Sequence, residues 1–186
     1  MILYPTETLY ALGVNALDRE ELDSLYALKG RESSKVASWL VREVADIEKF
    51  ALLDEVAMKV AQHLLPGQLT LVLETKKSID RNVVAPDGTI GFRVSTDPMA
   101  KKIIEDFMAE YDAPLTCTSA NVSGAPTFST PGEILQQFGE RANMIDQVID
   151  DGVRKGLAST VVKVINGEVT VIREGEISEA DILSVL

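Results

Sequence analysis

The segment IGFRVSTDPMAKKIIEDFMAEYDAPLTCT, residues 90–118, holds a strand, a helix and a second strand in close succession. Ile90–Val94 is apolar enough for a sheet interior, and the pair Asp97-Pro98 is a typical helix start. The helix is expected to run to about Tyr111, and Leu115–Thr118 is expected to form the next strand. Strands that alternate with helices in this way predict an α/β layer fold.

The rest of the chain extends this alternation. Leu69–Glu74 is a nearly continuous apolar run, typical of a strand buried on both faces. Asn166-Gly167 separates Ser159–Ile165 from Glu168–Arg173, which predicts a β-hairpin. Further strands are expected at Ile2–Tyr4, Val36–Arg42 and Gln147–Asp150, and further helices after the caps Asp18 (with Glu21 completing a capping box), Asp54, Thr130 and Ser178. The sequence predicts one domain, residues 1–186, with a mixed β-sheet flanked by helices.

Composition excludes several classes of protein. Hydrophobic residues make up 46% and charged residues 25% of the 186 residues, as in ordinary globular domains. No apolar run approaches the roughly 20 residues that a membrane helix needs, and the first residues do not resemble a secretory signal. A net charge of −11 opposes binding to nucleic acid or anionic lipid. Cys117 is the only cysteine and His63 the only histidine, so neither a disulfide nor a protein metal site is expected. A single cysteine also fits a reducing compartment, and we expect the protein to be cytoplasmic.

The familiar nucleotide-binding motifs are absent: the sequence has no P-loop and no dinucleotide-binding glycine motif after a strand. A different cationic feature stands at Lys29-Gly30-Arg31, with Lys35 nearby. One interpretation is a helix end whose cations complement the helix dipole. The other is a phosphate clamp on a loop, in which the cations serve a ligand and contribute little to folding.

Two polar segments lie at the ends of predicted strands. Residues 118–124, TSANVSG, either present hydrogen-bonding groups to a ligand or form a turn that satisfies its own backbone. In the strand around Arg93, Thr89, Gly91 and Ser95 share its face, opposite Ile90, Phe92 and Val94. That small, polar face suits the floor of a cavity, where Arg93 would need an anion and Gly91→Val would harm activity more than stability; the alternative is a solvated edge strand. Ser159 and Arg173 are expected to meet at one end of the late hairpin.

Six motifs together resemble the YrdC/Sua5/TsaC family in their order and spacing. They are YPTETLYALG (4–13), KGR (29–31), PGQLTLVL (66–73), SANVSG (119–124), STVV (159–162) and IREG (172–175). The resemblance implies a twisted α/β sheet around a large, positively lined cavity. It also implies a nucleotidyltransferase, L-threonylcarbamoyladenylate synthase, which joins L-threonine, bicarbonate and ATP to give threonylcarbamoyl-AMP and pyrophosphate. A partner threonylcarbamoyltransferase complex would then modify adenosine 37 of tRNA.

The resemblance also implies roles for individual residues. Lys29 and Arg31 would be the catalytic cations that neutralise the triphosphate, and Mg²⁺ would accompany ATP rather than sit in a protein site. Threonine would be bound by Thr8, Arg93, Ser119 and Ser159, and ATP by Lys29, Arg31, Lys35, Thr89, Asn121, Ser129 and Arg173.

Two other functions stay open at this point. A related enzyme could form carbamoyl-AMP, as the homologous domain of hydrogenase maturation proteins does in much longer chains. A non-catalytic module could bind double-stranded RNA or tRNA, although the charge of −11 opposes strong binding.

Overall fold

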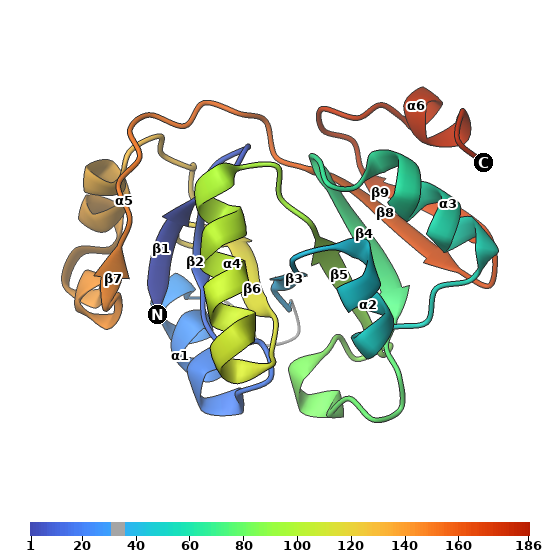
Figure 1. The fold of residues 1–186 in the computed structure, drawn as a ribbon. Helices are drawn as coiled ribbons and strands as arrows, with labels where there is room; N and C mark the ends of the chain where they lie inside the picture. Colours follow the sequence, from blue (N-terminus) through green and yellow to red (C-terminus); the bar gives the residue numbers. More distant parts are fainter. Residues whose placement is uncertain (31–35) are drawn as a thin grey trace.

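The computed structural model describes residues 1–30 and 36–186, and these residues form one mixed β-sheet with helices on both of its faces (Figure 1). Among the described residues the sheet has nine strands in the order β7-β1-β2-β6-β3-β5-β4-β8-β9. The strands are β1 (Ile2–Pro5), β2 (Tyr10–Gly13), β3 (Ser38–Leu40), β4 (Leu69–Glu74), β5 (Thr89–Arg93), β6 (Leu115–Ser119), β7 (Gln147–Val148), β8 (Thr160–Ile165) and β9 (Glu168–Arg173).

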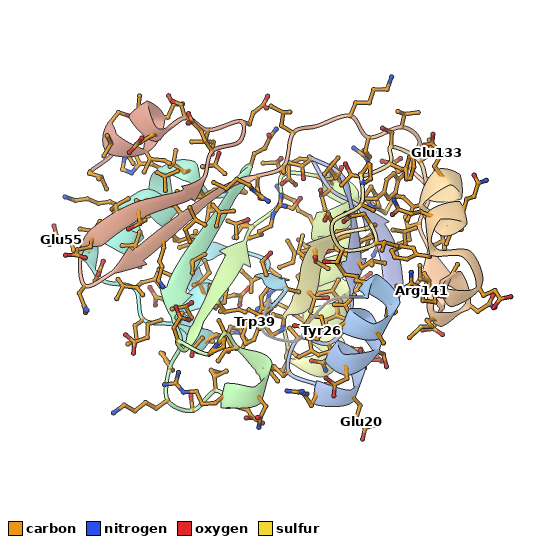
Figure 2. The ribbon with its side chains drawn as sticks, turned by 180° about the vertical axis from the view of Figure 1, so that it is seen from behind. Glu20, Tyr26, Trp39, Glu55, Glu133 and Arg141 are labelled. Carbon is orange, nitrogen blue, oxygen red and sulfur yellow. The ribbon has the colours of Figure 1, made fainter. Side chains whose placement is uncertain are left out.

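Helices cover the two faces unequally. Figure 1 shows α2 (Val44–Phe50), α3 (Glu55–Leu64) and α4 (Pro98–Tyr111) on the near face, whereas α1 (Arg19–Lys29) lies in front when the molecule is seen from behind in Figure 2. The remaining helices are α5 (Pro131–Phe138), α6 (Glu179–Leu183) and two 3-10 turns, η1 (Arg81–Val83) and η2 (Gly139–Met144). No helix in the described part of the chain is long and apolar enough to cross a membrane.

The structure confirms the elements with the clearest local signals. Asp97 caps α4 by accepting hydrogen bonds from the backbone N–H groups of Met99 and Ala100. Asn166 and Gly167 have φ angles of 52° and 77°, the positive values that a two-residue hairpin turn of this kind requires. The α/β fold class, a twisted mixed sheet flanked by helices, is therefore as predicted.

Several boundaries differ from the sequence predictions. The strand expected over Val36–Arg42 is reduced to Ser38–Leu40, and that expected over Gln147–Asp150 to Gln147–Val148. Asp18 caps α1 as predicted, but Glu21 does not complete a capping box with it. The carboxylate of Glu21 instead accepts a hydrogen bond of 2.8 Å from the backbone N–H of Asn15.

Aromatic packing in the core holds strand β5 in place. Phe92 on one face of β5 packs edge-on against Trp39 of β3, with ring centroids 5.7 Å apart, and Trp39 packs in the same way against Phe50 of α2. Phe92 and Trp39 are both fully buried. The opposite face of β5, with Gly91 and Arg93, lines a cavity. The prediction of two chemically different faces on this strand is confirmed.

Candidate substrate cavity

A cavity of about 480 Å³ lies over the polar face of the sheet. Its walls come from the β1–β2 turn, from β4, β5 and β6, and from the two strands of the late hairpin with the segment that precedes them. Six of the residues predicted to bind substrates line it: Thr8, Thr89, Arg93, Ser119, Ser159 and Arg173. The sheet therefore brings together side chains that lie far apart in the sequence.

Arg93 is buried in the cavity wall and paired with an internal carboxylate. Its Nη2 donates to Oε1 of Glu7, and the hydroxyl of Ser95 donates to Oε2 of the same carboxylate. Burial acts to lower the pKa of Arg93, but the acidic groups around it, among them the carboxylate of Glu7, outweigh that effect, and the pKa lies above its usual value. The sequence prediction that Arg93 is desolvated is confirmed, and Glu7 supplies one internal anion for it. Its binding of a ligand carboxylate stays a prediction.

Arg173 meets Ser159 at the other side of the cavity, as predicted. The guanidinium of Arg173 donates to the backbone oxygen of Ser159 through Nη2 at 2.8 Å and Nε at 3.2 Å. The hydroxyl of Ser159 is 2.8 Å from the hydroxyl of Thr70 on β4. Burial, and then the positive charge of Arg93, lower the pKa of Arg173 below its usual value. Two guanidinium groups therefore line one cavity, an arrangement that would favour an anionic ligand.

The β1–β2 turn holds Thr8 in place. The hydroxyl of Thr6 donates to the backbone oxygen of Leu9 at 2.6 Å and accepts from the backbone N–H of Thr8 at 3.2 Å. The hydroxyls of Thr6 and Thr8 are 3.0 Å apart, and Thr8 is almost fully buried. This hydrogen-bonded turn presents Thr8 to the cavity with little freedom to move.

A hydrogen bond to Asp87 orients the hydroxyl of Thr89. Its hydroxyl donates to Oδ1 of Asp87 at 2.7 Å, and Oδ2 of Asp87 accepts from the ammonium of Lys163 at 2.7 Å. The hydroxyl oxygen of Thr89 is left with acceptor capacity toward the cavity that Thr89 lines.

The loop after β6 turns back on itself. The hydroxyl of Ser119 donates to Oδ1 of Asn121 at 2.6 Å, and Nδ2 of Asn121 donates to the backbone oxygens of Ala125 at 2.7 Å and Val122 at 3.1 Å. Asn121 thus follows the interpretation of a turn that satisfies its own backbone. Ser119 lines the cavity, whereas Asn121 is not among its lining residues.

Lys29 stabilises that loop from the end of α1. It is 2% exposed, and its ammonium donates to the backbone oxygen of Ser119, to that of Asn121 at 3.0 Å and to Oδ1 of Asn121 at 3.5 Å. The expectation of a loop cation that contributes little to folding is wrong, because this ammonium is buried among carbonyl groups. Gly30, with a φ of 60°, ends the helix as predicted.

Of the three remaining predicted ATP ligands, the structure describes one, Ser129. Ser129 is not in the cavity lining; its backbone oxygen accepts from the backbone N–H of Arg154 at 2.9 Å. Arg31 and Lys35 lie outside the described residues.

The structure corrects the expected effect of filling the space at Gly91. A Cβ atom there would lie 2.7 Å from Cγ2 of Thr70 on β4 and 3.3 Å from Cβ of Ser38 on β3. A valine would meet these flanking strands before it reached the open cavity, so Gly91→Val is expected to harm stability at least as much as activity.

A strap between β7 and β8, residues 149–159, crosses from the β7 side of the sheet to the β8 side (Figure 1), and Ala158 and Ser159 at its end line the cavity. Arg154 fastens it to the start of α4 by an ion pair of 3.0 Å to Asp97, and Arg154 also pairs with Asp151 inside the strap. The backbone N–H of Gly156 donates to the backbone oxygen of Thr8 at 2.9 Å. A Cβ at Gly156 would lie 2.5 Å from that oxygen, so only glycine permits this contact.

Sequence reasoning missed three residues of this site: Glu7, Thr70 and Arg154. Glu7 and Thr70 lie inside quoted motifs, but each acts through a partner more than 80 positions away, Arg93 at a separation of 86 and Ser159 at 89. Arg154 lies outside all of the quoted motifs. No local pattern identifies such pairings.

Comparison with known proteins identifies relatives over nearly the whole chain. A family model for Sua5, YciO and YrdC proteins, described as "Telomere recombination", matches residues 1–175. A protein of Methanocaldococcus jannaschii is 35% identical over 178 residues, 95% of this chain and 80% of the relative, and its name assigns threonylcarbamoyl-AMP synthase only provisionally.

Solved structures agree with that match. Sua5 of Pyrococcus abyssi, determined in complex with L-threonine, is 28% identical with a TM-score of 0.88; the match covers 100% of this chain and 53% of that one, so this chain spans about half of it. Escherichia coli YciO is 25% identical with a TM-score of 0.82, covering 94% of this chain and 82% of YciO.

Proposed function

Because the chain belongs to the Sua5/YciO/YrdC family, we propose that it is a nucleotidyltransferase that forms threonylcarbamoyl-AMP and pyrophosphate from L-threonine, bicarbonate and ATP. The observation that carries this proposal is the cavity, in which Arg93 and Arg173 face one space lined with hydroxyl groups. The names of relatives and the threonine complex of Pyrococcus abyssi Sua5 support the same substrate.

Threonine would bind at the Arg93 end of the cavity. A guanidinium is well suited to hold a carboxylate, and Arg93 keeps donors besides the Nη2 that serves Glu7. The hydroxyls of Thr8, Ser119 and Ser159 line the same space and are positioned to bind the polar groups of the amino acid.

ATP would lie toward Arg173 and Thr89. Arg173 would neutralise phosphate charge, and Lys29, Asn121, Ser129, Arg31 and Lys35 remain the further proposed ATP residues. The ammonium of Lys29 donates to the backbone oxygen of Asn121, so these two residues would act by shaping the loop that carries Ser119. Mg²⁺ enters only as the counterion of the triphosphate; among the described residues no cluster of His, Cys, Asp or Glu side chains could hold a metal.

The reaction needs positioning more than a protein nucleophile. The amine of threonine adds to bicarbonate with loss of water, which gives an N-carboxylate. An oxygen of that carboxylate attacks the α-phosphorus of ATP, the bond from the α-phosphorus to the bridging oxygen breaks, and pyrophosphate leaves. Arg93 would hold the amino acid while Arg173 stabilises the charge on the phosphates. The product would pass to a partner that transfers the threonylcarbamoyl group to tRNA.

Mass detection of the product tests the proposal. Purified protein with ATP, bicarbonate and L-threonine should give threonylcarbamoyl-AMP, and pyrophosphate release should require both threonine and bicarbonate. Equal pyrophosphate release without threonine would contradict the proposal and favour a carbamoyl-AMP-forming enzyme. A filter-binding titration against salt covers the other alternative: a steep salt slope with tRNA and no adenylate product would indicate an RNA-binding module.

A further inference from the structure

We propose that Glu7 is a positioning residue for the amino-acid substrate, which holds the Arg93 guanidinium from behind so that its remaining donors face the cavity. The inference rests on the proposed function and adds to it a residue that never touches the substrate. Arg93 is among the residues that line the cavity and Glu7 is not, which is the arrangement expected of a carboxylate that acts through the guanidinium.

Both oxygens of Glu7 are already used. Oε1 accepts from Nη2 of Arg93 and Oε2 from the hydroxyl of Ser95. The side chains of Glu7 and Arg93 are only 9% and 8% exposed. Each oxygen of this nearly buried carboxylate already has one strong donor, which favours a role through Arg93 over direct contact with the substrate.

The carboxylate is itself fixed by the start of α4. The hydroxyl of Ser95, which donates to Glu7, accepts from the backbone N–H of Asp97 at 3.1 Å. Asp97 caps α4 through Met99 and Ala100 and pairs with Arg154 of the strap at 3.0 Å. Glu7 is therefore attached to a rigid element rather than to a mobile loop, which is what a positioning residue requires.

The guanidinium needs such a support because much of it is otherwise unheld. Nε of Arg93 is buried and has no hydrogen-bond partner among residues 1–30 and 36–186. Arg173 lines the same cavity, and the positive charges of the two guanidinium groups repel each other. Without Glu7, repulsion from Arg173 would push the Arg93 guanidinium out of the orientation that binds a carboxylate, and the Arg93 side chain would occupy more rotamers.

A competing role makes the opposite prediction. If Glu7 only occupied the place of the substrate carboxylate, its removal would leave Arg93 more positive and more available, and threonine would bind more tightly. If Glu7 positions Arg93, its removal weakens threonine binding while ATP binding stays nearly unchanged. The sign of the change therefore separates the two roles.

The experiment measures L-threonine and ATP affinity by calorimetry in the whole protein. Glu7→Gln keeps the shape and one acceptor oxygen, and it is expected to weaken threonine binding about threefold; Glu7→Ala is expected to weaken it about tenfold, the loss of one oriented charge-assisted hydrogen bond. ATP affinity should stay within about twofold in both variants. Glu48→Gln, an exposed carboxylate on α2, is the matched control and should change neither affinity.

A double-mutant cycle tests whether Glu7 acts through Arg93. In an Arg93→Ala background, Glu7→Gln should cause no further loss of threonine affinity. Tighter threonine binding in Glu7→Gln, unchanged binding, or an equal additional loss in the Arg93→Ala background would each overturn the inference. Because Glu7→Gln is isosteric, the cycle does not depend on Glu7→Ala folding.

Failure of this inference is distinguishable from failure of the proposed function. Threonine binding is measured without turnover. A wild-type protein that binds threonine but forms no threonylcarbamoyl-AMP contradicts the proposed reaction and leaves the role of Glu7 measurable. A wild-type protein that forms the product while Glu7→Gln binds threonine normally contradicts only the role of Glu7.

Discussion

Gly91→Ala tests how the sheet leaves room for the cavity. Gly91 lies at the middle of β5, between β4 and β3, and an added Cβ would lie 2.7 Å from Cγ2 of Thr70. Carbon atoms pack best at about 3.5–4.0 Å, so the methyl group of Thr70 must withdraw by about an ångström. Thr70 is not free to do so, because its hydroxyl is 2.8 Å from that of Ser159.

The cost follows from these two constraints. Overpacking of this kind costs about 1–3 kcal/mol, and loss of the hydroxyl pair adds about 0.5–1.5 kcal/mol. Gly91→Ala is therefore expected to lower the free energy of unfolding by about 2–4 kcal/mol, and the melting temperature by roughly 5–15 °C in a protein of this length. Urea unfolding followed by circular dichroism measures the change.

Two further variants make the result specific. Gly132→Ala is the matched control: Gly132 lies in the first turn of α5, and its Cβ would meet nothing within 4 Å. It should be neutral or stabilise the protein by up to about 1 kcal/mol. Thr70→Ser removes the obstructing methyl and keeps the hydroxyl, so in the Gly91→Ala background it should recover most of the loss. Equal stability of Gly91→Ala and Gly132→Ala, or no recovery with Thr70→Ser, would refute this reasoning.

Two other predictions concern buried charges. Lys29→Met should lower the free energy of unfolding by about 1.5–3 kcal/mol, since carbonyl oxygens lose a charged donor; the exposed Lys101→Met is its control, and equal melting temperatures would contradict the stabilising role. Hydrogen bonds from Arg42, and then from Lys49, lower the pKa of Asp46, so its stabilisation should be complete above the unfolded value of about 3.9 and disappear as the pH falls through the lower folded pKa. Asp46→Asn should therefore destabilise the protein at pH 7 and flatten its acid unfolding profile; an unchanged profile by pH titration of urea midpoints would argue against it.

Local signals account for the elements that the sequence predicted well. The Asp97-Pro98 start of α4 and the Asn166-Gly167 turn depend on backbone preferences of a few adjacent residues. The period-two pattern of β5 is equally local, and it separates the buried Phe92 from the cavity-facing Arg93.

The elements that were missed lack such signals. β2, Tyr10–Gly13, is four residues long and ends in glycine. α2, Val44–Phe50, has seven residues, and its N-cap Glu43 makes no side-chain capping hydrogen bond. β2 pairs with the adjacent β1 and with the distant β6, and α2 packs on the core through Phe50. Propensity over so short a window does not predict elements that depend on such packing.

The same distinction explains the site. Alternation along β5 is enough to place Arg93 on a cavity floor, but it does not identify the anion that Arg93 already has. Glu7 lies in the turn between β1 and β2, and the sheet order β1-β2-β6-β3-β5 brings that turn to Arg93 on β5. Lys29 is a second case: its position at a helix end was interpreted as dipole complementation or as a phosphate clamp, and neither interpretation included its burial by tertiary packing.

The charge of the whole protein and the charge of its cavity act on different ligands. A net charge of −11 sets the field that a long polyanion meets along the surface. Ions screen that field over about 8 Å at physiological salt, so a small anion inside the cavity responds chiefly to the guanidinium groups beside it. Arg93 and Arg173 both line the cavity. Among the described residues, one carboxylate, that of Glu7, forms an ion pair with Arg93, and none does so with Arg173. Two positive charges against one negative charge favour an anionic ligand. This separation of scales favours a carboxylate or a nucleotide as the ligand over an extended nucleic acid.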